Sequence, residues 1–167
     1  MNRLAIKYAL IAAIALVMWV MLEHEFGFNS ERHDIGQYTR IISAFIFYIF
    51  IFLAIRERRK IQRGNLKFSQ GFQTGALMVI IYGALSTCWF AAYSKFINPT
   101  FFETVMKFEM EELQKANASA EEIASTAERL SHNGSPLSFL FLFAFTCIGG
   151  LLMTLLFSYL LKTKKQV

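Results

Sequence analysis

Six residues of the kinds found in metal and acid–base sites lie near the start of the sequence. They are Glu23, His24, Glu25, His33, Asp34 and Arg40. Imidazole and carboxylate groups are ligands that a transition metal accepts, and His132 could add another imidazole. Their spacing is irregular, however, and a zinc-protease helix needs a second histidine four residues after the first. We therefore interpret this polar group as solvated charge, with a metal site as the alternative, and expect no catalytic residue, metal or cofactor.

Arg40 is the most informative member of this group, because it lies near one end of a short apolar segment. A cationic side chain at that position has to reach the membrane interface or pair with an acid. Glu23 and Glu25, at the end of the preceding apolar segment, are the expected partners. We predict that Arg40 anchors the orientation of its segment, with a role in binding a ligand as the alternative.

The other residues with reactive side chains form no recognised catalytic pattern. The sequence contains no glycine-rich phosphate loop, no nucleophile elbow and no paired carboxylates inside an apolar segment. Cys88 and Cys147 lack CxxC or Cys/His metal spacing. We expect both to be buried thiols that pack as small apolar groups, with a disulfide as the alternative. These observations predict a protein that is not an enzyme.

The composition indicates that these residues are positioned by membrane helices. The 167 residues are 55% hydrophobic and 17% charged, whereas a soluble domain carries roughly 25% charged residues. So short a chain cannot hide that many apolar side chains from water, which excludes a typical soluble enzyme. We predict one all-α transmembrane domain over 1–167, because backbone in lipid must satisfy its own hydrogen bonds. The four expected spans, each near the ~20 residues that a bilayer requires, are 4–22, 37–55, 72–96 and 137–161.

The first span could be taken for a signal peptide. Its small residues lie inside the apolar run, however, and no cleavage site follows that run. We therefore interpret it as a retained span.

The charged residues are distributed unequally among the connections. The N-terminus, the connection between spans two and three, and the tail hold 11 of the 17 basic residues and one of the 12 acidic residues. Because basic residues stay on the cytoplasmic side, we predict that both termini and the middle connection are cytoplasmic. The net charge of +5 is then an orientation signal, and we expect no nucleic-acid partner. The basic run 56–67 could also attract anionic lipid, but topology alone is our preferred interpretation.

The longest connection, 97–135, predicts two amphipathic helices on the extracytoplasmic side. Apolar residues cover one broad face of 101–113, and Ser119 followed by Glu122 forms a capping box for a second helix. Its acidic polar face disfavours simple adsorption to anionic lipid, so we expect this segment to fold over the bundle or to pack against a partner protein rather than to lie on the membrane.

Small residues recur at four-residue spacing on the third and fourth spans, which allows close helix approach in lipid. We therefore predict an intimate antiparallel pair, with Phe45, Phe47, Phe50 and Phe52 of the second span facing lipid. Ser69 is the expected N-cap of the third helix. The proposed packing residues are Gly71, Gly75 and Gly83 on the third span, and Thr146, Gly150 and Thr154 on the fourth.

Two short stretches carry a resemblance. The segment 64–72, which reads GNLKFSQGF and leads to Gly75, and the segment 93–99, which reads YSKFINP, are similar to motifs of a numbered domain-of-unknown-function family. That family comprises small four-span bacterial inner-membrane proteins. The resemblance implies an inner-membrane location in a gram-negative bacterium, with no activity, substrate or catalytic residue to carry over.

Two classes of function follow. The first is a non-enzymatic structural, interaction or accessory component of the membrane, whose partners are the lipid bilayer and either another membrane protein or a second copy of the chain. The alternative is a small transporter or a lipid- or solute-binding protein with a pocket between the spans. Transport usually requires ionisable groups at the midplane or interrupted helices, and the midplane here is weakly polar, so we favour the first class.

Overall fold

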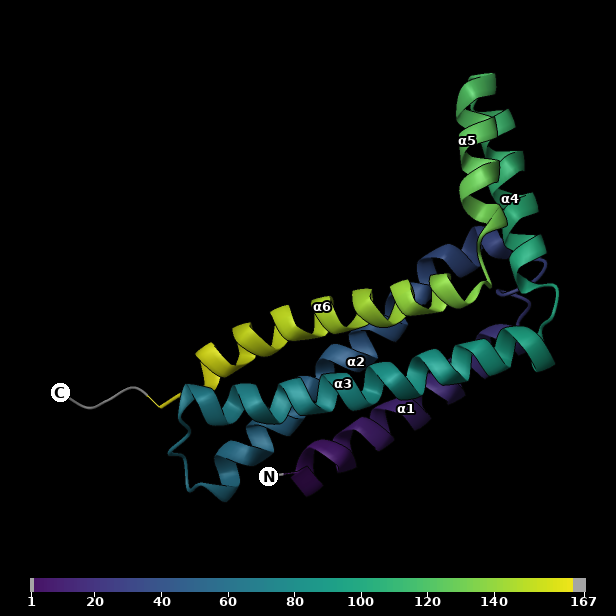
Figure 1. Ribbon diagram of the computed structural model, residues 1–167. Coiled ribbons are helices and arrows are strands. Elements are labelled where there is room, and N and C mark those ends of the chain that lie inside the picture. The colour runs from purple at the N-terminus through teal and green to yellow at the C-terminus, as the bar shows by residue number, and fades with distance from the viewer. Residues whose placement is uncertain (1, 164–167) are drawn as a thin grey trace.

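The computed structural model describes residues 2–163, which form six α-helices and one π-helical segment, with no strand among them. The α-helices are α1 (Asn2–Glu25), α2 (His33–Ile61), α3 (Phe68–Ala92), α4 (Phe101–Lys115), α5 (Ala120–Ser131) and α6 (Pro136–Leu161), and η1 (Tyr93–Ile97) is the π-helical segment that continues α3 (Figure 1).

Four of these helices are long and apolar enough to cross a membrane. The segments that could span the membrane are 23 residues of α1, 29 residues of α2, 30 residues of α3 together with η1, and 26 residues of α6. The predicted all-α protein with four membrane-spanning helices is confirmed. Helices α1, α2 and α3 with η1 extend past the predicted apolar runs, because polar residues continue the helical backbone, whereas α6 matches its predicted run to within one residue.

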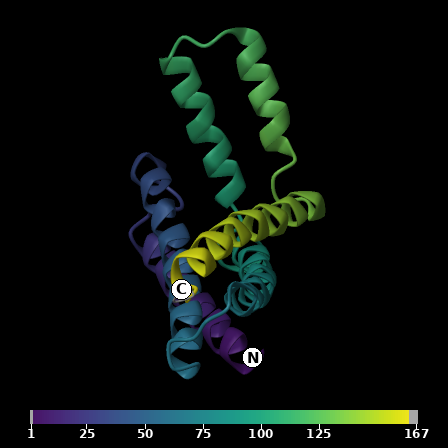
Figure 2. The ribbon, with the colours of Figure 1, turned by 90° about the vertical axis from the view of Figure 1, so that its left-hand side faces the viewer.

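Helix α3 lies at the centre of the bundle and contacts the three other long helices, most extensively α6 (Figure 2). Small residues allow this approach. A Cβ on Gly75 would lie 2.5 Å from Cγ2 of Thr154, and a Cβ on Gly71 would lie 3.1 Å from Oγ of Ser158. The backbones are therefore as close as glycine permits, which maximises van der Waals contact where lipid offers no hydrophobic driving force.

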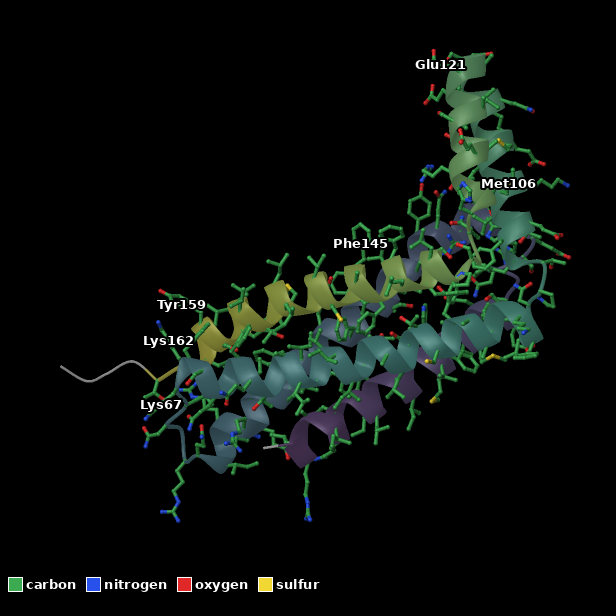
Figure 3. All side chains as sticks on the ribbon, viewed as in Figure 1. Lys67, Met106, Glu121, Phe145, Tyr159 and Lys162 are labelled. Atoms are coloured by element: carbon green, nitrogen blue, oxygen red, sulfur yellow. The ribbon has the colours of Figure 1, made fainter. Side chains whose placement is uncertain are left out.

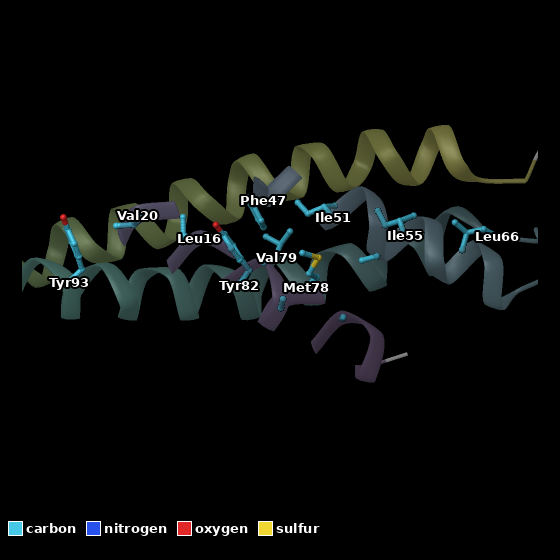
Figure 4. Packing of buried hydrophobic residues seen from close by; sticks show 14 of the residues in the cluster. Leu16, Val20, Phe47, Ile51, Ile55, Leu66, Met78, Val79, Tyr82 and Tyr93 are labelled. Carbon is cyan, nitrogen blue, oxygen red and sulfur yellow. The ribbon is translucent and has the colours of Figure 1, made fainter. Parts of the chain in front are cut away.

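The core lies where α1, α2 and α3 meet (Figure 4). Phe47 stacks on Tyr82 with ring centroids 4.1 Å apart and is only 4% exposed. The prediction that Phe47 faces lipid is therefore wrong, whereas Phe45 is exposed. Phe47 lies one turn from Ile51, which is also buried, and both belong to the α2 face that meets α3.

The start of α1, the α2–α3 connection and the end of α6 lie at one end of the bundle, which we call the basic end. Lys7 pairs with Glu57 at 3.3 Å, and Thr163 donates its backbone N–H to the Leu66 carbonyl. Figure 3 shows Lys67 and Lys162 together at this end, far from Met106 and Glu121.

Helix α3 begins at Phe68, two residues earlier than a Ser69 N-cap would require, so Ser69 is not its N-cap. Lys67 occupies that position, and its backbone N–H donates to Oε1 of Gln70 at 3.0 Å. Ser69 is exposed within the first turn.

Helices α4 and α5 form a hairpin at the opposite end, which we call the hairpin end. The hairpin runs across the direction of the long helices and extends beyond α6 (Figures 1 and 2). The first turns of α4 pack on the core through Phe101, Phe102 and Val105, whereas α5 has no buried residue. Folding over the bundle, one of the expected placements, therefore holds only for the base of α4.

Candidate functional site

A cavity of about 640 Å3 lies between the spans at the hairpin end. All four long helices and the base of α4 contribute to its wall. Polar residues of the wall include Glu23, Asn29, Arg40 and Asn133. Aromatic residues supply much of the remainder, among them Phe47, Tyr82, Trp89, Phe90, Phe139 and Phe145. A volume within the usual range of ~300–1,000 Å3 and a mainly apolar wall with few polar groups are typical of a small-molecule site.

The α1–α2 connection brings the first polar residue into this wall. Backbone bonds from Ser30, Glu31 and Arg32 to the Gly27 carbonyl close a tight turn. Gly36 then approaches the Phe28 carbonyl so closely that a Cβ would collide with it. The ends of α1 and α2 are thereby held together, and Glu23, only 3% exposed, accepts a 2.6 Å hydrogen bond from Oγ1 of Thr39.

Arg40 belongs to a hydrogen-bonded chain that joins α2 to α4. Its Nη2 lies 3.1 Å from Nδ1 of His33, and a guanidinium can only donate. His33 must therefore carry its proton on Nε2, which lies 2.9 Å from Oγ1 of Thr104. Thr104 in turn donates to the Phe101 carbonyl at 3.0 Å. The chain ties the base of the hairpin to the bundle beside the cavity.

The prediction that Arg40 pairs with Glu23 or Glu25 is wrong, since no such ion pair forms within residues 2–163. The reason is geometric. His33 lies two turns before Arg40 on the same face of α2, and helical side chains point toward the helix N-terminus. Arg40 therefore reaches along its own helix toward His33 and also stacks over the Phe101 ring at 5.6 Å.

A second polar cluster is built around the π-helical segment. The Asn98 backbone N–H donates to the Tyr93 carbonyl at 2.8 Å, an i to i+5 bond. This turn aligns Asn98 Nδ2 with the Asn29 carbonyl (2.8 Å) and with the Tyr93 hydroxyl (3.2 Å). The same hydroxyl lies 3.1 Å from Nδ1 of His24. Tyr93, which is fully buried, thus connects α1, the first connection and the end of α3.

Two donors that belong to cavity-lining residues find no acceptor within residues 2–163. Nε of Arg40 and Nε1 of Trp89 are both buried, and neither donates a hydrogen bond to any of these residues. Both are N–H groups, and a buried N–H without an acceptor costs about 1–3 kcal/mol. Both nitrogens are covered by neighbouring protein atoms, so the charged groups that the wall offers a ligand are the Arg40 and Glu23 side chains.

The cavity opens on the lipid-facing side along α6. Phe145 and Leu142, which line it, are 72% and 38% exposed, and Phe145 projects from the outer side of α6 in Figure 3. Farther toward the basic end, contacts between α2 and α6 close the cavity. Phe47 contacts Gly150 there, and Tyr48 approaches Gly149. A molecule could therefore enter from the surrounding lipid.

The polar residues that the sequence groups together do not form one site in the structure. His24 and His33 serve the two separate networks, Glu23 lines the cavity, and Glu25 and Asp34 are exposed. In the part of the chain that the structure describes, no three His, Cys, Asp or Glu side chains lie close enough to hold a metal ion.

The predicted packing residues lie mostly between α3 and α6. Gly71 and Gly75 contact Ser158 and Thr154, and Gly150 approaches Val79. Gly83 faces Phe143 and Cys147, whereas Thr146 lines the cavity. Cys88 and Cys147 are both free thiols, and the prediction that both are buried is wrong, since Cys88 is exposed and Cys147 is half-buried.

Sequence reasoning did not single out Asn29, Asn98 and Thr104. Two signals point to Asn98: it belongs to the segment 93–99 that carries the family resemblance, and it precedes Pro99, which stops the helix where the third span ends. The roles of Asn29 and Thr104 depend on contacts across more than 60 residues of sequence.

The comparisons with known proteins identify a family and no individual relative. No curated protein sequence and no solved structure matches the chain. The family described as "Protein of unknown function (DUF4199)" matches residues 7–163. Since that match covers nearly the whole chain, this integral, multi-pass membrane protein belongs to the DUF4199 family.

Proposed function

We propose that the protein is a non-enzymatic binding protein that holds one lipid-like amphiphile in the hairpin-end cavity. The observation that carries this proposal is the composition of the cavity wall. Its polar residues include Asn29, Arg40 and Asn133, and the rest is largely aromatic and open to lipid. A polar headgroup would lie beside these residues, and an acyl chain would lie against the rings.

Binding is a better account of this cavity than transport. The basic-end side of the cavity is closed by the contacts of Phe47 and Tyr48 with α6. The helix irregularity, η1, lies at the hairpin end and not at the middle of a span. An alternating path through the bundle usually uses midplane ionisable groups or broken helices, so the arrangement supports a one-sided site.

The experiment fills the cavity without changing its polar residues. Ala44 lines the cavity, whereas Ala84 is exposed on α3 and does not line it. We expect the wild-type chain, purified in mild detergent, to retain a stoichiometric amphiphile measurable by mass spectrometry of the extract. Ala44→Phe should lose it, while Ala84→Phe, which adds the same side chain to the outer surface, should keep it.

Equal retention by the two variants would contradict the proposal. Size-exclusion profiles and helical content are the controls for folding, since both variants add one phenyl group to a long helix.

We further propose that the protein lies in a bacterial inner membrane with both termini in the cytoplasm. The basic N-terminus, the α2–α3 connection and the end of α6 lie at one end of the bundle, which supports this orientation under the positive-inside rule. A reporter that is active only outside the cytoplasm, fused after Val167, should be inactive. Activity of that reporter would contradict the orientation.

A second candidate is an interaction component, and the hairpin is the observation that favours it. Helices α4 and α5 extend beyond the bundle (Figure 2), and apolar residues such as Met106 and Leu113 stay partly exposed. A partner membrane protein or a second copy of the chain could cover them. Co-purification of a stoichiometric protein that is lost when the hairpin is altered would support this candidate over amphiphile binding.

A further inference from the structure

A separate pocket lies at the basic end of the bundle, between the end of α2 and the end of α6. Its volume is about 300 Å3, and its wall comprises Phe52, Arg56, Arg59, Lys60, Gly64 and Leu161. Half of these residues are basic, and they belong to one face of α2, because residues three and four positions apart are neighbours on a helix. The pocket therefore gathers three positive charges on one short surface.

Among residues 2–163, no acidic side chain forms an ion pair with these three basic residues. Glu57 is the one acid near this end, and it is bound on the α1 side by Lys7 at 3.3 Å and by the Tyr8 hydroxyl. Glu57 also acts electrostatically on Lys60, but one acid faces three basic side chains, which leaves an excess of positive charge at the mouth of the pocket.

Hydrogen bonds from the end of α6 give the pocket a fixed shape. Thr163 Oγ1 donates to the Gly64 carbonyl at 2.6 Å and accepts the Leu66 N–H at 2.8 Å. Arg59 Nε donates to the same Gly64 carbonyl at 3.4 Å, which orients its guanidinium and leaves the terminal nitrogens unbonded within the described residues. Gly64 has φ +89°, and no atom lies within 4 Å of where its Cβ would be.

The apolar residues of the wall indicate that the ligand also has an apolar part. Phe52 lies one turn before Arg56 on α2, toward the middle of the bundle, and packs edge-on against Phe157 of α6 at 5.5 Å, whereas Leu161 is the last residue of α6. Basic residues above an apolar groove between spanning helices match a phosphate group and the first part of an acyl chain.

We propose that this pocket binds the headgroup of an anionic phospholipid, with the phosphodiester between Arg56, Arg59 and Lys60 and an acyl chain along Phe52 and Leu161. The site is independent of the hairpin-end cavity and does not rest on the function proposed for it. It gives three basic residues of the run 56–67 a role beyond topology, since Arg56, Arg59 and Lys60 line the pocket. A rule based on charge number alone would not distinguish them from the rest of the run.

The test compares two double variants that remove equal charge. Arg56→Gln with Lys60→Gln removes two exposed residues of the pocket wall, and Arg63→Gln with Lys67→Gln removes two exposed residues of the same connection outside it. The full chain is placed in nanodiscs of phosphatidylcholine, with or without phosphatidylglycerol. Native mass spectrometry then measures how much phosphatidylglycerol the released protein retains.

We expect the wild type and the outside variant to prefer phosphatidylglycerol to phosphatidylcholine. The pocket variant should lose affinity by roughly 25-fold, which corresponds to about fivefold for each basic residue near an anionic headgroup. Equal losses in both variants would overturn the proposal, because they would show diffuse attraction to the whole run. Inorganic phosphate, added to detergent-solubilised protein, should raise the melting temperature less than phosphatidylglycerol does. An equal shift with phosphate alone would overturn the assignment to a lipid.

Discussion

Arg40 and His33 are joined by a 3.1 Å hydrogen bond between Nη2 and Nδ1, two turns apart on the same face of α2. Because arginine donates, the bond selects the histidine tautomer with its proton on Nε2, the atom that faces Thr104 of α4. This side-chain contact adds a hydrogen bond to the apolar packing of Phe101, Phe102 and Val105 that attaches the base of the hairpin.

Replacing Thr104 with valine should loosen the base of the hairpin. Valine keeps the shape but removes the acceptor of His33 Nε2, and a partner left unsatisfied costs about 1–3 kcal/mol. We expect faster amide hydrogen exchange in α4 and little change in the long helices. Thr126→Val is the matched control, since Thr126 lies on α5 and makes no side-chain hydrogen bond in the described chain. Equal exchange in the two variants would show that the His33 bond does not hold α4.

Gly75→Ala should destabilise the α3–α6 contact. Its Cβ would lie 2.5 Å from Cγ2 of Thr154 and 3.2 Å from Cδ1 of Ile55, and such overpacking costs about 1–3 kcal/mol. Gly149→Ala is the control, because its Cβ would meet only the Tyr48 hydroxyl, at 3.1 Å. Thermal unfolding in detergent should show a lower midpoint for the Gly75 variant alone. A midpoint that falls equally for both would indicate a general effect of removing glycine.

Tyr93→Phe should destabilise the hairpin end of the bundle. The hydroxyl that it removes lies within hydrogen-bonding distance of both His24 and Asn98 in a fully buried position. We expect a loss of about 1–3 kcal/mol in the free energy of unfolding. Tyr38→Phe removes the same atom from a residue that is 68% exposed and should change stability by less than about 0.5 kcal/mol. Similar losses for the two variants would contradict the role of the buried network.

Thr163→Val should release the end of α6 from the α2–α3 connection. It removes the hydroxyl that donates to Gly64 and accepts from Leu66, at about 0.5–1.5 kcal/mol for each bond. Thr163→Ser keeps the hydroxyl and should behave as the wild type. Protease cleavage within 62–67 is the measurement, and faster cleavage of the valine variant is the expected result. Cleavage of the serine variant at the valine rate would mean that the methyl group, and not the hydroxyl, holds the connection.

The sequence by itself determined the four spanning helices and the unequal charge of the connections. Both follow from local properties of the sequence, namely the length of an apolar run and the number of basic residues in a connection. A run of about 20 apolar residues must cross a bilayer as a helix, and basic residues count toward orientation wherever they lie in a short connection. The close packing of the third and fourth spans was likewise predictable, because four-residue spacing places small residues such as Gly75 and Thr154 on one face of their helices.

Only the tertiary structure decided which way each helix turns and what its polar residues meet. Phe47 was expected to face lipid and instead stacks on Tyr82, because a span that is apolar on all sides contains no sign of which face is inside. Arg40 was assigned to an acid and instead bonds to His33, because the choice depends on side-chain direction along α2. The cavity exists only where all four long helices and the base of α4 come together. No local pattern encodes such a volume, since each helix contributes only part of its wall.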